Sequence, residues 1–331
     1  MNGRNAHIIA SGSYAPKKII PNSYFNELLG EDVDTWLKEK VQIYSRHWCD
    51  ENESTADLVE QACKITLSKV DIAADEIDLL IVATDTPEYI SPSTSVIVQY
   101  RLGMTKAGTF DINTACAGFV TALDTGVKYI QADEHYKNIL VVGAYSMSKY
   151  LQEKDKKTIT LFADGAAAVL LQSSADNNSG YKQSKLFSLG EYHDWMGIYG
   201  GASKYPMDEN KLQNKMHQLH FVKKIPAELN TEIWSKMILE ICEREKIAVH
   251  EVDHFFFTQI NINSIFDTMD KLGVNRQKAA TIMHEYGYTG SACIPMAFDQ
   301  WMEMNKIKKD EYVIFMGSGG GLAFGVSLFK M

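Results

Sequence analysis

The chain has 331 residues, 45% of them hydrophobic and 23% charged, which is typical of a folded globular protein and excludes disordered and fibrous classes. Acidic residues outnumber basic ones by 42 to 33, and the net charge of -9 argues against a nucleic-acid-binding surface. Five cysteines without a CxxC pair favour free thiols, a cytoplasmic location and no metal site. We find no signal-peptide pattern and no apolar run of about 18 residues, so we expect no membrane span.

Apolar runs of strand-forming residues alternate along the chain with stretches of helical spacing. Such runs lie at 79–83 and 139–143 in the first half, and at 255–257 and 312–316 in the second. This alternation is typical of parallel strands joined by crossover helices. The sequence therefore predicts an α/β fold.

The predicted elements occur in the same order twice. A helical stretch at 55–69 precedes the strand after Asp78, and another at 231–246 precedes the strand after Asp253, 175 residues later. A duplicated α/β unit places its two copies face to face about a pseudo-twofold axis. We expect a functional site where the copies meet.

The repeat divides the chain into three parts. Residues 1–175 form an N-terminal half that carries the candidate nucleophile, and residues 227–331 form a C-terminal half. Between them, residues 176–226 are polar, aromatic and irregular. A connection of this length is typical of a binding region or lid, and a solvated linker is the alternative.

Cys116 is the candidate nucleophile. A predicted strand ends at Asn113, small residues form the next turn, and 121–131 has helical spacing, so Cys116 falls at the start of a helix. The unpaired N–H groups and the positive dipole end there favour a thiolate, and we expect them to lower the pKa of the thiol. The alternative is a small core residue without a chemical role.

Several segments resemble motifs of the β-ketoacyl-acyl-carrier-protein synthase III family, in the thiolase superfamily. Residues 111–119, DINTACAGF, are similar to the DxxxACAGF segment that carries the family's acyl-accepting cysteine. Residues 162–168, FADGAAA, resemble the family's FGDGAGAAV, and the glycines at 319–321 resemble its C-terminal glycine turn. The resemblance spans nearly the whole chain and implies a thiolase-like, five-layered αβαβα fold with two pseudo-twofold-related halves.

The resemblance implies a cysteine acyl-enzyme. Cys116 stands at the position of the nucleophile that takes an acyl group from a thioester. The backbone N–H groups of Cys116 and Gly320 stand at the positions of the oxyanion hole. The acyl group then comes from acyl-CoA or an acyl carrier protein, which are substrates, and no permanently bound cofactor is expected.

The resemblance also implies sites for the two ends of the substrate. Trp36 matches a tryptophan that stacks on the adenine of coenzyme A, Lys40 replaces a family arginine, and Lys149 and Lys156 stand near further arginines. Residues 85–92, DTPEYISP, resemble a loop that closes the acyl pocket of the partner in the family's dimer. Its candidate pocket residues are Tyr89, Ile90 and Ser91.

Two positions depart from the family pattern. The family has a histidine where this chain has Thr258, and an asparagine where it has Tyr288. In the family these two groups donate hydrogen bonds to the thioester carbonyl of the malonyl carrier protein during decarboxylation. Threonine carries no titratable proton near neutral pH, and tyrosine is much larger than asparagine.

Two functional hypotheses of different classes follow. In the first, the chain is an acyltransferase of fatty-acid-like or specialised-metabolite biosynthesis that takes an acyl group onto Cys116. It then passes the acyl group to a nucleophile other than a decarboxylated malonyl unit, or it condenses by an altered geometry. In the second, it is a non-condensing subunit that supports a related catalytic chain. The expected assembly is accordingly a homodimer or a heterodimer.

Overall fold

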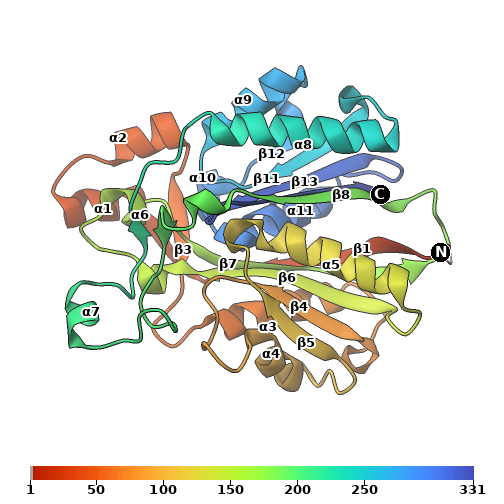
Figure 1. Cartoon of the computed structure of the whole chain (residues 1–331), viewed down its shortest axis with the longest axis horizontal. Coiled ribbons are helices and arrows are strands. Elements are labelled where there is room, and N and C mark those ends of the chain that lie inside the picture. The colour runs from red at the N-terminus through yellow and green to blue at the C-terminus, as the bar shows by residue number, and fades with distance from the viewer. Residues whose placement is uncertain (1–2) are drawn as a thin grey trace.

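Two five-stranded sheets form the framework of the computed structural model, which describes residues 3–331 (Figure 1). In spatial order, the first sheet contains β1 (Asn5–Tyr14), β7 (Asp164–Ser174), β6 (Asn138–Ser146), β4 (Leu79–Ala83) and β5 (Gly108–Ile112). The second contains β12 (Ala279–Ala280), β11 (Val252–Phe257), β13 (Tyr312–Gly319), β14 (Ala323–Lys330) and β8 (Gly180–Ser188).

The two sheets have the same topology. In the first, β4 pairs in parallel with β5 and β6, while β7 pairs antiparallel with β6 and β1. In the second, β11 pairs in parallel with β12 and β13, while β14 pairs antiparallel with β13 and β8. This correspondence confirms the duplicated α/β fold predicted from the order of elements.

β8 lies inside the stretch 176–226 that the sequence analysis describes as irregular. It forms the outer strand of the second sheet and pairs with β14 along Gly180–Ser188. That description is wrong for this strand. The strand lacks an apolar run because it is an edge strand that stays half-exposed and contains polar residues such as Lys182, Gln183 and Lys185.

Helices complete the layers above, between and below the sheets (Figure 1). Helices α5 (Gly118–Ala132) and α11 (Cys293–Glu303) lie between the two sheets and are buried along most of their length. The outer face of the first sheet is covered by α3 (Thr55–Leu67) and α4 (Thr94–Leu102), and that of the second by α8 (Leu229–Glu245) and α9 (Ile262–Leu272). This is the αβαβα layering expected from the resemblance.

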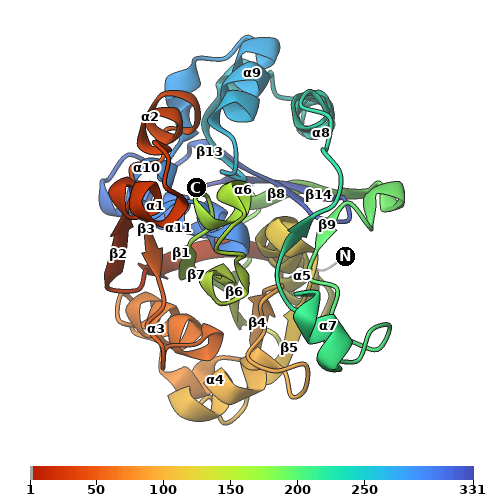
Figure 2. The same cartoon turned by 90° about the vertical axis from the view of Figure 1, so that its left-hand side faces the viewer.

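The remaining elements gather at one end of the layers, the end that faces the viewer in Figure 2. They are α1 (Asn22–Leu29), α2 (Asp34–Trp36), α6 (Lys156–Ile159), α7 (Glu209–Gln213), α10 (Met283–Tyr286), the hairpin of β2 (Lys18–Pro21) with β3 (Ser45–Trp48), and the pair β9 (Met196–Gly197) and β10 (His220–Phe221). Within residues 3–331 no helix combines the length and apolarity needed to cross a membrane.

Candidate active site

Cys116 lies in a sharp turn between β5 and α5. The turn is a single 3-10 turn at Ala115–Ala117, and α5 begins at Gly118, so the predicted position at a helix start is confirmed. Ala115 has a φ of 47°, in the left-handed region that residues with a Cβ rarely adopt, and its N–H donates to Asn113 Oδ1 at 3.1 Å. The Cys116 side chain is only 3% exposed.

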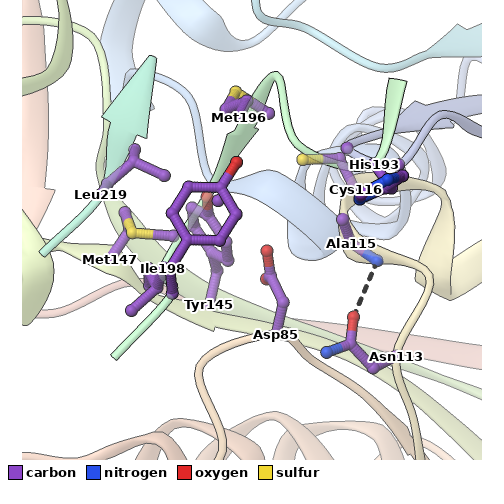
Figure 3. Close-up of a pocket in the computed structure, with 14 residues that line it drawn as sticks. Asp85, Asn113, Ala115, Cys116, Tyr145, Met147, His193, Met196, Ile198 and Leu219 are labelled. Atoms are coloured by element: carbon purple, nitrogen blue, oxygen red, sulfur yellow. Dashed lines mark hydrogen bonds between the residues drawn. The ribbon is translucent and has the colours of Figure 1, made fainter. Parts of the chain in front are cut away.

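Cys116 opens into a cavity of about 240 Å³ between the two halves (Figure 3). The carboxyl ends of β5 and β13 lie on either side of it, as in other open α/β sheets, where sites form at the carboxyl ends of strands. The lining residues are Asp85, Asn113, Ala115, Cys116, Tyr145, Met147, His193, Met196, Gly197, Ile198, Tyr199, Leu219, Gly320 and Gly321.

The irregular connection between the halves forms one wall of this cavity. Residues 193, 196–199 and 219 all come from it. His193 is exposed to solvent, whereas Leu219 is buried and holds the segment down through an N–H that donates to the Tyr150 carbonyl at 2.8 Å. The segment therefore covers the candidate nucleophile, which is the placement expected of a binding region.

The glycine turn after β13 packs directly against the nucleophile turn. A Cβ at Gly319 would lie 2.5 Å from the Thr114 carbonyl oxygen and 2.6 Å from the Cys116 backbone nitrogen. Only a residue without a side chain fits there. The close packing brings Gly320 and Gly321 into the cavity wall beside Cys116.

The environment of Cys116 raises the pKa of its thiol well above the ordinary value. Burial is the main cause, and the negative charge of Asp85 adds to it, while a hydrogen bond from Tyr288 opposes both. The sequence-based expectation of a lowered pKa is therefore wrong. The helix start is where predicted, but desolvation and a facing carboxylate outweigh the dipole.

Tyr288 is buried beside Cys116 and donates its phenol hydrogen bond to the thiol. Its ring packs against Phe162 at 5.4 Å and against Tyr145 at 6.4 Å between centroids. Its backbone is also fixed, because its N–H donates to the Leu161 carbonyl at 2.9 Å. The side chain predicted to stand at the family's asparagine position is thus held against the nucleophile.

Thr258 is buried and does not line the cavity. Its hydroxyl donates to the Ser318 carbonyl at 3.2 Å and accepts from the Ser318 N–H at 2.9 Å. The single hydroxyl proton of Thr258 is therefore used in the hydrogen bond to β13. The group predicted to stand at the family's histidine position has no proton left to offer a substrate.

Asp85 begins the candidate pocket loop 85–92, but the sequence pattern did not single it out as a site residue. It follows β4 by two positions and lines the cavity, and its Oδ1 is buried without a hydrogen-bond partner among residues 3–331. Burial raises the pKa of its carboxyl to about 6. The signal available was its position after a fully buried parallel strand, where side chains reach the carboxyl edge of the sheet.

The candidate coenzyme-binding residues lie outside the cavity, and only two of them, Trp36 and Lys156, lie in contact with each other. The Lys156 ammonium lies 5.7 Å from the centre of the half-buried Trp36 ring. Lys40 is exposed four residues beyond Trp36. Lys149 instead donates to the carbonyls of Asp50 and Glu51, at 2.9 and 3.0 Å.

The candidate acyl-pocket residues do not line the cavity of their own chain. Tyr89, Ile90 and Ser91 are all exposed on the loop between β4 and α4, and Ile90 is 81% exposed. Any contribution to an acyl pocket would have to be made to another chain.

Tyr288→Phe should slow alkylation of Cys116 about tenfold at fixed pH. The change removes the hydrogen bond that opposes the rise in the pKa of the thiol, and such a bond is worth about 1.5 kcal/mol. The measurement is the rate of iodoacetamide addition followed by mass. Tyr145→Phe is the control, since Tyr145 packs on Tyr288 without bonding to the thiol. Equal rates for Tyr288→Phe and the wild type would contradict the proposed contact.

Comparisons with known proteins agree with the motifs. The model of 3-oxoacyl-[acyl-carrier-protein] synthase III matches residues 110–190, and that of its C-terminal part matches residues 242–331. The chain is 35% identical to the β-ketoacyl-[acyl-carrier-protein] synthase III of Clostridium perfringens, over 99% of both chains, and 32% identical to that of Aliarcobacter butzleri, over 96% of both.

Solved structures of related synthases superpose closely on this fold. The synthase III of Aquifex aeolicus has a TM-score of 0.88 at 27% identity, with 98% of this chain and 100% of that one covered. The priming β-ketosynthase of the R1128 polyketide pathway, 22% identical, has the same fold with a TM-score of 0.88 over 99% of this chain and 96% of that one. With its full length matched at this identity, the chain belongs to the 3-oxoacyl-[acyl-carrier-protein] synthase III family.

Proposed function

We propose that this transferase takes an acyl group from an acyl thioester onto Cys116 and passes it to an acceptor other than a decarboxylated malonyl unit. The observation that carries the proposal is the position of Cys116, in a cavity between the glycine turn and the start of α5. The thioester is acyl-CoA or an acyl carrier protein, as for the carrier-dependent synthases named above.

In the loading step the Cys116 sulfur attacks the thioester carbonyl carbon, the carbon–sulfur bond to the carrier breaks, and the proton of the Cys116 thiol passes to the departing carrier thiolate. The negative charge that develops on the carbonyl oxygen is stabilised by the backbone N–H groups of Cys116 and Gly320. The tight packing of Gly319 on the Cys116 backbone supports this role, because it holds the two N–H groups in a fixed arrangement.

The acceptor is proposed to differ from the usual one because both donors for malonyl decarboxylation are lost. The Thr258 proton is bound to Ser318, and Tyr288 donates to the nucleophile itself. Each donor missing from developing negative charge lowers the rate by about a hundredfold. A fatty-acid-like or specialised-metabolite pathway with another acceptor fits this site better than chain initiation with malonyl thioesters.

We place the coenzyme A nucleotide at Trp36 and Lys156, whose contact forms a flat aromatic face beside a positive charge. Lys40, exposed four residues beyond Trp36, is proposed to contact the same nucleotide, and so is Lys149, which bonds to the carbonyls of Asp50 and Glu51. The exposed Tyr89, Ile90 and Ser91 are proposed to complete the acyl pocket of a second chain in a dimer.

The loading proposal is tested by incubating the protein with acetyl-CoA and octanoyl-CoA and measuring its intact mass. We expect one acyl adduct on the wild type and none on Cys116→Ala. Cys293→Ala is the matched control, because Cys293 is also buried but does not line the cavity, and it should still load. Absence of an adduct on the wild type would refute the proposal.

A second candidate function is a non-condensing subunit of a heterodimer, favoured by the engagement of Thr258 away from the cavity. It predicts that the chain copurifies with a related chain that retains the histidine and asparagine. Turnover of loaded Cys116 by the isolated chain would exclude this second role.

A further inference from the structure

Asp85 is a cavity residue for which the loading step has no use. Figure 3 shows its carboxylate pointing into the space between Tyr145 and Cys116. The charge of Asp85 reaches both of these groups, since it contributes to raising the pKa of each. The carboxylate therefore lies within electrostatic range of the nucleophile.

The Oδ1 atom of Asp85 lacks the N–H partners that other buried or partly buried carboxylates of this protein have. Asp164 accepts from the N–H groups of Cys49 and Ser148 at 2.7 and 2.8 Å, and Asp111 accepts from those of Thr94 and Ser95 at 2.6 and 2.9 Å. Asp85 Oδ1, in contrast, has no partner among residues 3–331. A buried carboxylate without a partner costs stability, so a structural role does not account for it.

Among residues 3–331, Asp85 is the only carboxylate in the cavity wall. The other titratable groups that line the cavity or interact with the charge of Asp85 are Cys116, Tyr145, Tyr150, Tyr199 and His193. Burial raises the pKa of Cys116 and of the three tyrosines, so all four stay protonated. His193 is exposed to solvent, which leaves Asp85 as the proton acceptor inside the cavity.

We propose that Asp85 is the general base of the transfer step and that the acceptor is a hydroxyl or amino group. This inference rests on the proposed acylation of Cys116. The Asp85 carboxylate takes the proton from the acceptor as the oxygen or nitrogen bonds to the acyl carbon. The bond from that carbon to the Cys116 sulfur breaks, and the thiolate receives the proton from Asp85, which restores both groups.

This assignment explains why the site can lack an imidazole. Transfer to an O–H or N–H acceptor needs a base, such as a carboxylate or an imidazole, beside the acyl carbon. Malonyl decarboxylation needs no base, because carbon dioxide is released, but it needs hydrogen-bond donors to the enolate. The hydroxyls of Thr258 and Tyr288 are engaged with Ser318 and Cys116, and the cavity wall holds a carboxylate whose Oδ1 has no partner among residues 3–331. The proposed hydroxyl or amino acceptor therefore accounts both for the missing enolate donors and for the presence of Asp85.

The test isolates the transfer step from loading. Wild type, Asp85→Asn and His193→Gln are each acylated with octanoyl-CoA or acetyl-CoA, freed of excess thioester, and mixed with methoxyamine or ethanol. Methoxyamine is an uncharged amine over the pH range used, so its own ionisation does not shape the profile. Loss of the acyl mass is followed from about pH 5 to pH 8.

We expect the wild-type rate to rise with pH and to level off with an inflection near 6, where Asp85 ionises. Asp85→Asn should load but transfer at least about a hundredfold more slowly, without the inflection. His193→Gln should keep the inflection.

A wild-type profile without the inflection, or an inflection that survives in Asp85→Asn or disappears in His193→Gln, would overturn the assignment. Failure of the wild type to acylate would instead refute the proposed function, so the two failures are distinguishable. Thermal unfolding and the loading of Asp85→Asn show whether that variant keeps its fold.

Discussion

Gly319→Ala is expected to lower the free energy of unfolding by about 3 kcal/mol and to slow acylation of Cys116 about a hundredfold. The added Cβ would lie 2.5 Å from the Thr114 carbonyl oxygen and 2.6 Å from the Cys116 nitrogen. Both are backbone atoms in a turn already held by Ala115 at positive φ, so neither can move away cheaply. Relief of the overlap requires β13 and the nucleophile turn to separate, which displaces the N–H groups around the reacting carbonyl.

The matched control is Gly320→Ala, one residue along the same turn. Its Cβ would first meet the end of the flexible Met196 side chain, at 3.4 Å, so we expect a loss of stability below about 1 kcal/mol. Urea denaturation of the two variants measures the difference, and the acyl-CoA mass assay reports the loading rate. Equal stability of the two variants would show that the nucleophile turn is not packed as described.

Asp85→Asn is expected to raise the free energy of unfolding by about 3 kcal/mol at pH 8. Burial raises the pKa of Asp85 from 3.8 to about 6, so the folded protein binds this proton more tightly than the unfolded chain. Stability from this group is therefore present below pH 3.8 and is lost as the pH rises to 6. A shift of about two pKa units corresponds to a loss of about 3 kcal/mol in the free energy of unfolding once the carboxyl is ionised. The uncharged asparagine side chain does not cause this loss.

The pH dependence distinguishes this effect from a general change in packing. The stability gain of Asp85→Asn should be full above pH 7 and should vanish near pH 4, as measured by denaturation at each pH. Asp111→Asn is the contrasting variant, because the Asp111 carboxylate accepts two N–H groups at the start of α4 and its loss should destabilise the fold. A destabilised Asp85→Asn at pH 8 would mean that Asp85 has a stabilising partner in the folded protein.

A gain in stability together with a loss of transfer would be the behaviour expected of a site residue. An unpaired carboxylate in a cavity destabilises the fold and is kept for its chemistry. The same variant therefore tests the energetic and the chemical description of Asp85 by independent measurements.

Local sequence patterns predicted the duplicated fold, since strands such as β4 and β13 are short apolar runs whose spacing needs no tertiary information. They missed β8, because a half-exposed edge strand has no such run. They also placed Cys116 at a helix start, because the small residues between β5 and α5 mark the turn.

The chain by itself thus determined the α/β repeat and the family, and it predicted the candidate nucleophile and the departures from the family pattern at Thr258 and Tyr288. Only the tertiary structure decided how the site behaves: the thiol of Cys116 has a raised rather than lowered pKa, Thr258 bonds to β13, and Asp85 faces the nucleophile without a partner. The reason is physical. Secondary structure follows from neighbours in the chain, whereas burial and electrostatic interaction sum over groups such as Asp85, Cys116 and Tyr288 that only folding brings together.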